Sequence, residues 1–258
     1  MANAIRIKPN WARPLWVALA LEGWISVLVC VIAIAATAEP NALDHPARFA
    51  PSVAMPLTGK PQTANFLEEP VSDTARRVAN WVVASDDNKD LPFLVVDKVA
   101  AKVFVFDSEG RLRGATLALL GKAYGDDTVA GIGGRKLSAI RPEERTTPAG
   151  RFVAMLGRDL KQDILWIDYG NALSLHRVIF GAPSDHRLQR LATPSALDKR
   201  ITYGCINVPV LFFEDIVLKT FTGTKGIVYI LPETKPIEDV FPGVIEMKSQ
   251  KVSGAVLN

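Results

Sequence analysis

Phe93-Leu94-Val95-Val96-Asp97 and Val103-Phe104-Val105-Phe106-Asp107 decide the fold class of this chain of 258 residues. Short runs of β-branched and aromatic residues are typical of strands. Similar runs occupy residues 151–156, 163–169, 172–178 and 226–231. Strands at such close intervals predict a mainly β domain, built as a mixed sheet or as a β-sandwich of sheets folded over each other.

Two segments have the pattern of helices. Residues 72–84 begin with Ser72-Asp73, which can cap a helix, and apolar residues follow at helical spacing. Residues 210–221 form the second segment, with Pro209 at its start and a glycine just past its end. The strands are therefore expected to be accompanied by one or two helices.

The N-terminus predicts export. Basic residues near the start precede a mostly apolar stretch that ends in Ala36-Thr37-Ala38, which is the organisation of a secretory signal. An uncleaved membrane anchor is the alternative, because the stretch is about as long as the ~20 residues that span a bilayer. Glu22 would cost about 2–3 kcal/mol near the bilayer centre, which weakens that alternative. Both alternatives place the rest of the chain outside the cytoplasm.

The chain divides into four expected regions. Residues 1–38 are the signal peptide or membrane anchor, and residues 39–90 are a linker rich in proline and alanine followed by the short helix. Residues 91–232 form the folded domain, and residues 233–258 form a peripheral tail. The net charge of +3 is too diffuse for nucleic acid, which would require a clustered basic stripe.

Cys205 lies in the segment Thr202-Tyr203-Gly204-Cys205-Ile206-Asn207 and is one of two cysteines. Because Cys30 lies in the predicted signal, the folded domain holds a single thiol, which cannot form an intramolecular disulfide. Cys205 is then either a small buried hydrophobe or a nucleophile. Gly204 and Asn207 favour the nucleophile. Gly204 permits a tight loop, and we expect the Asn207 side chain to hold that loop by hydrogen bonds to its backbone. The backbone N–H groups of such a loop can bind an oxyanion.

A cysteine nucleophile needs a base, and the chain has three histidines. His45 lies in the proline-rich linker, and His186 has the surroundings of a surface loop. His176 ends an alternating strand in which it shares a face with Ser174. We therefore expect His176 to activate Cys205. No metal site is expected, because neither Cys-x-x-Cys nor His-x-x-x-His spacing occurs.

Together these residues resemble the catalytic domain family of the L,D-transpeptidases, of the YkuD type. The signature of that family is a histidine, a spacer and then Ser/Thr-His-Gly-Cys-hydrophobic-Asn. The chain matches it at His176, Thr202, Gly204, Cys205, Ile206 and Asn207. Thr147-Pro148-Ala149-Gly150-Arg151-Phe152 resembles the family's Thr-Pro-x-Gly-x-Phe segment, and the resemblance covers roughly residues 91–232.

The chain departs from the family pattern in its motif and its spacer. Tyr203 replaces the histidine before Gly-Cys, and Arg177 replaces a glycine that often follows the first histidine. A phenol cannot act as a base at neutral pH, although Tyr203 can still donate a hydrogen bond as part of the oxyanion loop. The base is then His176 alone, or His186 contributes from the spacer.

The spacer is longer than usual and carries a cationic insert around residues 186–199. Arg200, next to it, can contact a carboxylate of the substrate, and Thr202 and His186 are further candidates for substrate contacts. Alternatively, the insert is a solvated charged loop that makes no contact with a substrate.

The resemblance implies an enzyme of the periplasm or cell wall that acts on peptidoglycan stem peptides and requires no cofactor. Cys205 would form a thioester with one stem, with His176 shuttling the proton, and an amine of a second stem would resolve it. Resolution by water would make the enzyme an L,D-carboxypeptidase. Tyr203 keeps a third alternative open, a catalytically inactive wall-binding module. An uncleaved N-terminus would add association with the inner membrane.

Overall fold

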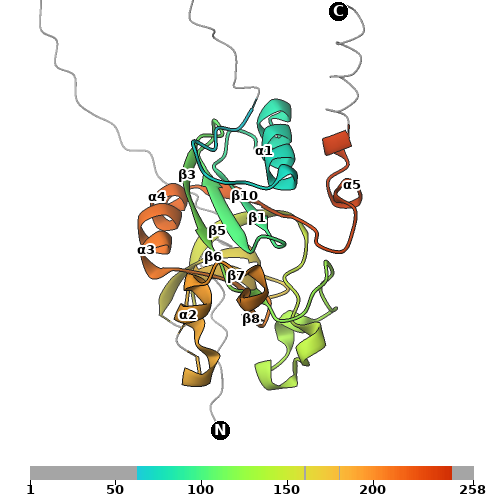
Figure 1. The fold of residues 1–258 in the computed structure, drawn as a ribbon, viewed down its shortest axis with the longest axis vertical. Coiled ribbons are helices and arrows are strands. Elements are labelled where there is room, and N and C mark those ends of the chain that lie inside the picture. The colour runs from blue at the N-terminus through green and yellow to red at the C-terminus, as the bar shows by residue number, and fades with distance from the viewer. Residues whose placement is uncertain (1–62, 160, 180, 246–258) are drawn as a thin grey trace, which may run out of the picture. The chain divides into compact units, whose positions relative to one another are not determined.

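The computed structural model describes residues 63–159, 161–179 and 181–245, which belong to one compact unit. Its main element is an eight-stranded mixed sheet with the order β3-β2-β1-β10-β5-β6-β7-β9 (Figure 1). The strands are β1 (Phe93–Asp97), β2 (Lys102–Phe106), β3 (Leu112–Leu117), β5 (Gly150–Asp159), β6 (Gln162–Asp168), β7 (Leu173–Arg177), β9 (Ile206–Val208) and β10 (Lys225–Ile230). The predicted mainly β class is confirmed.

The two edges of this sheet approach each other. Leu119, just after β3, and Asn207 of β9 exchange backbone hydrogen bonds of 2.8 and 2.9 Å. Next to this bridge, β4 (Leu120–Gly121) pairs in parallel with β8 (Arg200–Thr202). The sheet is therefore nearly closed, and β9 lies at the closure.

Strand β1 is buried on both faces of the sheet. Leu94 and Val96 contribute to one apolar core, and Phe93 and Val95 contribute to the other. A strand covered on both sides can be apolar at every position, which explains the unbroken run at residues 93–97.

Helix α1 (Asp73–Ser85) covers one face of the sheet. The Ser72 hydroxyl accepts a hydrogen bond of 3.1 Å from the Ala75 N–H, so Ser72 is the N-cap, and Val78 and Val82 are fully buried. The helix predicted at residues 72–84 is confirmed to within one residue.

The second predicted helix, at residues 210–221, forms with a change of geometry in its middle. It consists of α3 (Val210–Phe212), a π-helical segment η7 (Phe213–Leu218) and α4 (Lys219–Phe221). Phe213, Val217 and Phe221 pack into the core that contains Leu94. Shorter helices α2 (Arg187–Ala192) and α5 (Ile237–Val240) complete the set of α-helices in the described part of the chain.

Packing continues on both sides of the region predicted as the folded domain. Phe66, from the proline-rich segment, makes edge contacts with Phe104 and Phe106, at ring-centre distances of 5.5 and 5.1 Å. Beyond residue 232, Ile237 and Phe241 are buried in the same core as α1. The C-terminal segment as far as residue 244 is thus packed and not peripheral as expected, because its apolar side chains complete the core under α1.

The predicted signal or anchor at residues 1–38 lies outside the described residues. Within the described part, no helix combines the length and the apolar character needed to cross a bilayer.

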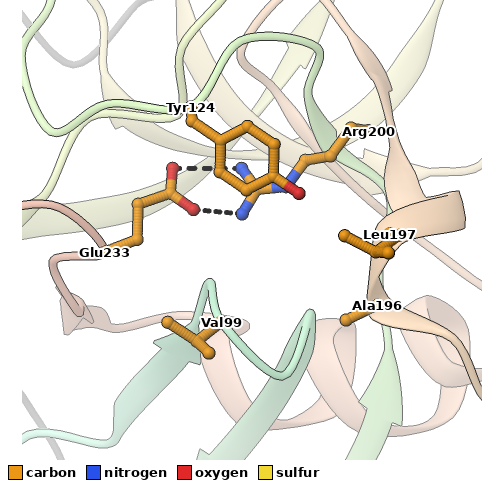
Figure 2. A pocket seen from close by; sticks show the side chains of 6 residues that line it. All are labelled: Val99, Tyr124, Ala196, Leu197, Arg200 and Glu233. Carbon is orange, nitrogen blue, oxygen red and sulfur yellow. Dashed lines mark hydrogen bonds and ion pairs between the residues drawn. The ribbon is translucent and has the colours of Figure 1, made fainter.

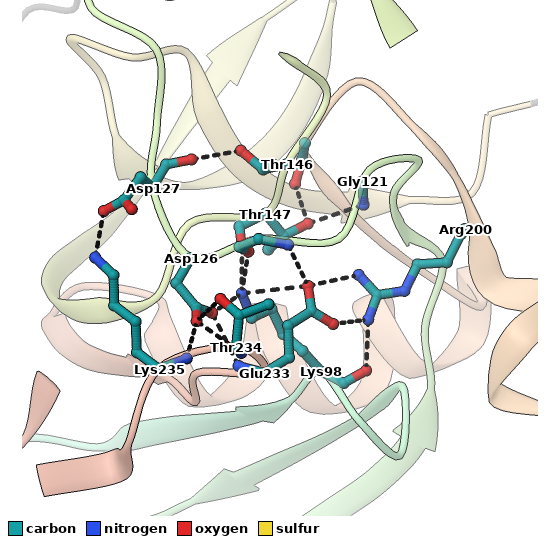
Figure 3. Close-up of polar contacts among 12 residues, drawn as sticks. Lys98, Gly121, Asp126, Asp127, Thr146, Thr147, Arg200, Glu233, Thr234 and Lys235 are labelled. Carbon is teal, nitrogen blue, oxygen red and sulfur yellow. Dashed lines mark hydrogen bonds and ion pairs between the residues drawn. The ribbon is translucent and has the colours of Figure 1, made fainter. Parts of the chain in front are cut away.

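Lys98 is the centre of a buried charged cluster (Figure 3). Its side chain is fully buried, and Nζ donates hydrogen bonds to Gly125 O (2.7 Å), Asp126 Oδ1 (2.7 Å) and Thr147 O (2.8 Å). Burial lowers the pKa of Lys98, and the hydrogen bond to Asp126 opposes that shift. Three acceptors match the three N–H groups of an ammonium, so we describe Lys98 as protonated.

Asp126 is the counter-ion of Lys98. Burial by itself would raise the pKa of Asp126, but hydrogen bonds from Lys98, from the Thr234 hydroxyl and from backbone N–H groups outweigh it and lower the pKa well below its usual range. The backbone donors are Glu233 N (2.9 Å), Thr234 N (2.8 Å) and Lys235 N (2.7 Å). The carboxylate therefore stabilises the fold at neutral pH, and this contribution is lost only as the pH falls through the depressed pKa.

We expect Lys98→Met to lower the free energy of unfolding by about 3–5 kcal/mol, because it leaves the buried Asp126 carboxylate without its counter-ion. Denaturant unfolding followed by circular dichroism measures this loss. Lys219→Met is the matched control, since Lys219 pairs with Asp215 on the surface and such a pair contributes about 0–1 kcal/mol. If both variants lose the same free energy of unfolding, the buried Lys98 cluster is no more important for stability than a surface ion pair, and the prediction is wrong.

Candidate active site

Cys205 lies in the short loop between β8 and β9, and Thr202 closes this loop. The Thr202 hydroxyl accepts a hydrogen bond from Gly204 N (3.2 Å) and donates one to Cys205 O (2.7 Å). Thr202 is buried, and its side chain holds the loop through these two bonds, so its predicted contact with a substrate stays a prediction. The Gly204 N–H, a predicted oxyanion donor, is occupied by the same contact.

Gly204 is required by the shape of the loop. Its φ is +127°, and a Cβ at this position would lie 2.7 Å from Thr146 O. The Gly204 carbonyl accepts a hydrogen bond from Thr147 Oγ1 (2.7 Å), and Thr147 Oγ1 itself accepts one from Gly121 N (2.9 Å). The Thr-Pro-x-Gly segment noted in the sequence therefore lies directly against the cysteine loop.

The cysteine loop is connected to the buried charged cluster through Thr147. Lys98 Nζ donates to the Thr147 carbonyl (Figure 3). The Thr147 hydroxyl in turn donates to the Gly204 carbonyl. Two hydrogen bonds and one residue thus link the buried cation to the residue before the thiol.

The Cys205 thiol contacts the end of the β6–β7 turn and the start of β7. Its Sγ donates to Ala172 O (3.4 Å) and accepts from the Ser174 hydroxyl (3.5 Å). Burial raises the pKa of Cys205, and the hydrogen bond from Ser174 opposes the shift. The resting side chain is therefore a neutral thiol at neutral pH.

His176 lies opposite Asn207 in the parallel pairing of β7 with β9. Its Nδ1 is 2.7 Å from Arg177 O, and its Nε2 is 3.1 Å from Asn207 Nδ2. Leu175 and Ile206 point into the core, so His176, Asn207 and Ser174 share the other face. Asn207 thus binds the predicted base, where we expected bonds to the backbone of its own loop.

No hydrogen bond joins His176 to Cys205 among the residues that the structure describes. The two residues are diagonal neighbours across the β7–β9 pair, because His176 is opposite Asn207. Burial lowers the pKa of His176, and the nearby Arg187 lowers it further, while the backbone contact to Arg177 opposes the shift. Thiol and imidazole are therefore both neutral in the resting site.

The other predicted residues lie around this centre with different partners. The ring of Tyr203 stacks under the Arg145 guanidinium, 3.9 Å from its carbon to the ring centre. His186 is exposed, with a left-handed backbone (φ 48°) just before α2, and does not join the His176 side chain.

Arg200 forms a buried ion pair with Glu233 and also donates to Lys98 O (2.9 Å). Figure 2 shows this pair beneath Tyr124, in a pocket of about 250 Å³ whose other walls are apolar: Val99, Ala196 and Leu197. Because the charge of Arg200 is already matched, a contact with a substrate carboxylate would require the pair to open. That contact stays a prediction.

Ser174 and Arg187 are the site residues that the sequence did not single out as candidates. Ser174 shares a strand face with His176. The alternation of apolar and polar residues along this strand was the feature of the sequence that could have identified Ser174. Arg187 was one of several cations in the insert, and only the tertiary structure distinguishes it. It donates from Nη1 to Asn207 Oδ1 at 3.1 Å. No group of three or more potential metal ligands occurs in the described ranges.

No family model and no curated protein matches this chain. Solved structures do match. A mutant form of the helical cell shape determining protein Pgp2 from Campylobacter jejuni is 14% identical, with a TM-score of 0.37, over 71% of this chain and 65% of that one.

Two L,D-transpeptidase structures also match. That of Xylanimonas cellulosilytica is 15% identical, with a TM-score of 0.33, over 55% of this chain and 60% of that one. The catalytic domain from Enterococcus faecium is 15% identical, with a TM-score of 0.35, over 55% of this chain and 98% of that one. This chain spans less than two thirds of the Campylobacter and Xylanimonas chains. At such low identities and TM-scores, the proposals below rest on the residues of the site.

We expect alkylation of Cys205 by iodoacetamide to be slow at pH 7 and to accelerate through and above the ordinary cysteine range near pH 8.5, because burial raises the thiol pKa. A Cys30→Ser background isolates Cys205, and mass spectrometry measures the rate. Ser174→Ala should slow the reaction further, since it removes a hydrogen bond that favours the thiolate. A rate that is already constant below pH 7 would instead indicate a thiolate–imidazolium pair.

Proposed function

We propose that this chain is an exported cysteine acyltransferase that acts on peptidoglycan stem peptides and forms a thioester at Cys205. The observation that carries the proposal is the placement of the Cys205 thiol. It lies on a loop held from both sides by Thr202 and Thr147, and the neighbouring strand presents His176 opposite Asn207, two residues after the thiol. The motif around Cys205 supports the substrate class, and the N-terminal pattern supports export.

Acylation starts when Cys205 Sγ attacks the carbonyl carbon of the third stem residue. For this step His176 Nε2 exchanges the Asn207 hydrogen bond for the thiol proton. The tetrahedral oxyanion then collapses and breaks the peptide bond. The departing D-alanine amine takes the proton from His176, and the acyl group remains on sulfur as a thioester.

Deacylation repeats these proton transfers in reverse. An amine from a second stem attacks the thioester carbonyl and gives its proton to His176. The bond to sulfur breaks, and Cys205 recovers a proton as the new amide forms. Water in place of the amine releases a carboxylic acid, which is the L,D-carboxypeptidase outcome.

Incubation with a carbapenem tests the nucleophile, because the strained β-lactam carbonyl acylates an activated thiol. We expect the intact mass to rise by one carbapenem, and Cys205→Ala to abolish the adduct. His176→Ala should slow acylation by about 10²–10⁴-fold, the usual contribution of a general base.

Two variants control for other nucleophiles. Cys30→Ser removes the second thiol, and Ser174→Ala removes the hydroxyl that donates a hydrogen bond to the Cys205 thiol. Both should retain the adduct. An adduct that persists in Cys205→Ala, or the absence of any adduct in the wild type, would rule out the proposed nucleophile.

Wall composition then distinguishes crosslinking from trimming. Cells that contain the gene should yield more crosslinked stem dimers than cells without it if an amine resolves the thioester. Shortened monomers without new dimers would identify the carboxypeptidase.

A non-catalytic wall-binding module is the second candidate, and the resting geometry favours it in one respect. Asn207, and not the Cys205 thiol, occupies the Nε2 position of His176. Such a module would sediment with isolated walls and give no carbapenem adduct.

A further inference from the structure

Arg187, from the insert between β7 and β8, reaches the predicted base through one intervening side chain. Its Nη1 donates to Asn207 Oδ1 at 3.1 Å, and Asn207 Nδ2 lies 3.1 Å from His176 Nε2. His176 Nδ1 in turn lies 2.7 Å from Arg177 O. The four groups form one continuous chain of hydrogen bonds.

The direction of every hydrogen bond in this series is fixed by the groups at its two ends, the Arg187 guanidinium and the Arg177 carbonyl. A guanidinium has only N–H donors, so it must face the oxygen of the Asn207 amide. The amide N–H₂ then faces His176, and Nε2 must be the unprotonated acceptor. At the other end the Arg177 carbonyl only accepts, so the ring proton lies on Nδ1. Arg187 and the carbonyl thus select the same tautomer from opposite ends.

The insert is built to hold Arg187 in place. Asp185 Oδ2 accepts a hydrogen bond from Arg187 Nε at 3.0 Å, and the Arg187 side chain is only 16% exposed. At Gly181 a Cβ would lie 2.3 Å from Asp185 Oδ2 and 2.9 Å from Arg187 Nε. The close fit shows that Arg187 is a packed residue and not a solvated surface cation.

The charges near His176 come from its own strand and from the elements packed around it. Arg187 of α2 disfavours the imidazolium, and Asp159 at the end of β5 favours it. On β7 itself, Arg177 forms an ion pair with Glu214. Cys205, before β9, is neutral at rest.

We propose that Arg187 is a positioning residue that, through Asn207, holds His176 as the neutral Nδ1–H tautomer with Nε2 ready to accept a proton. This rests on the proposed function, because a base at Nε2 has a purpose only if Cys205 is acylated. If Asn207 rotated its amide by 180°, its oxygen would face His176 and would select the opposite tautomer. Arg187 prevents that rotation, since an N–H₂ group would then face the guanidinium.

Nitrogen NMR of the histidine rings tests the assignment on the full chain, without substrate. The wild type should show His176 as the Nδ1–H tautomer at neutral pH. In Arg187→Met we expect a mixture of tautomers and an upward shift of the His176 titration midpoint. Arg187→Lys, which keeps a charge and only donors, should restore much of the wild-type spectrum.

Arg190→Met is the matched control, because Arg190 lies in the same short helix and contacts only backbone carbonyls, Asp185 O at 2.8 Å and Asp198 O at 2.9 Å. It should leave the His176 signals unchanged. If it shifts them as much as Arg187→Met does, the effect belongs to the fold of the insert and the proposal is wrong. An unchanged tautomer in Arg187→Met would equally overturn it. Arg187→Gln is the substitute if Arg187→Met does not fold.

Carbapenem acylation provides the second measurement. We expect Arg187→Met to lower the rate about tenfold, as part of the general-base contribution is lost, and Arg190→Met to retain the wild-type rate. If the wild type is never acylated, the proposed function is wrong. The NMR experiment needs no acylation, so it would still test whether Arg187 sets the His176 tautomer.

Discussion

The buried ammonium of Lys98 is the constraint on which the site depends. A cation removed from water must find acceptors for all its protons, and Lys98 finds them on Gly125, Asp126 and Thr147. Those acceptors come from two loops, and Asp126 binds a third segment at residues 233–235. A single charge therefore brings these segments together, and Thr147 extends its influence to Gly204 beside the thiol.

The closure of the sheet places the remaining parts. Because Leu119 pairs with Asn207, strand β9 lies between β7 and the β4–β8 pair, and the loop before it faces the start of β7. Cys205, Ser174, His176 and Asn207 meet there as neutral groups. Because these groups are neutral, the direction of their hydrogen bonds matters more than their charge, and Arg187 enters the site as a side chain that can only donate.

Local patterns were sufficient for much of the fold. The helix after Ser72, the helix after Pro209 and the strand at residues 93–97 depend on neighbours in the sequence, and all three formed where predicted. The burial of Phe66 and Phe241 was missed, because single aromatic residues in proline-rich or charged segments have no periodicity. Arg200 was predicted to face a substrate, and its partner Glu233 lies too far along the chain for any spacing rule to indicate the pair.

The sequence by itself determined the class of fold and the single thiol of the described residues, and it predicted His176 as the base for that thiol. Only the tertiary structure decided how these residues are connected: Ser174 to the thiol, Asn207 to the histidine, and Arg187 to Asn207. The physical reason is that residue type and spacing specify what a side chain can donate or accept. The partner it meets depends on which distant strands the closed sheet brings into register.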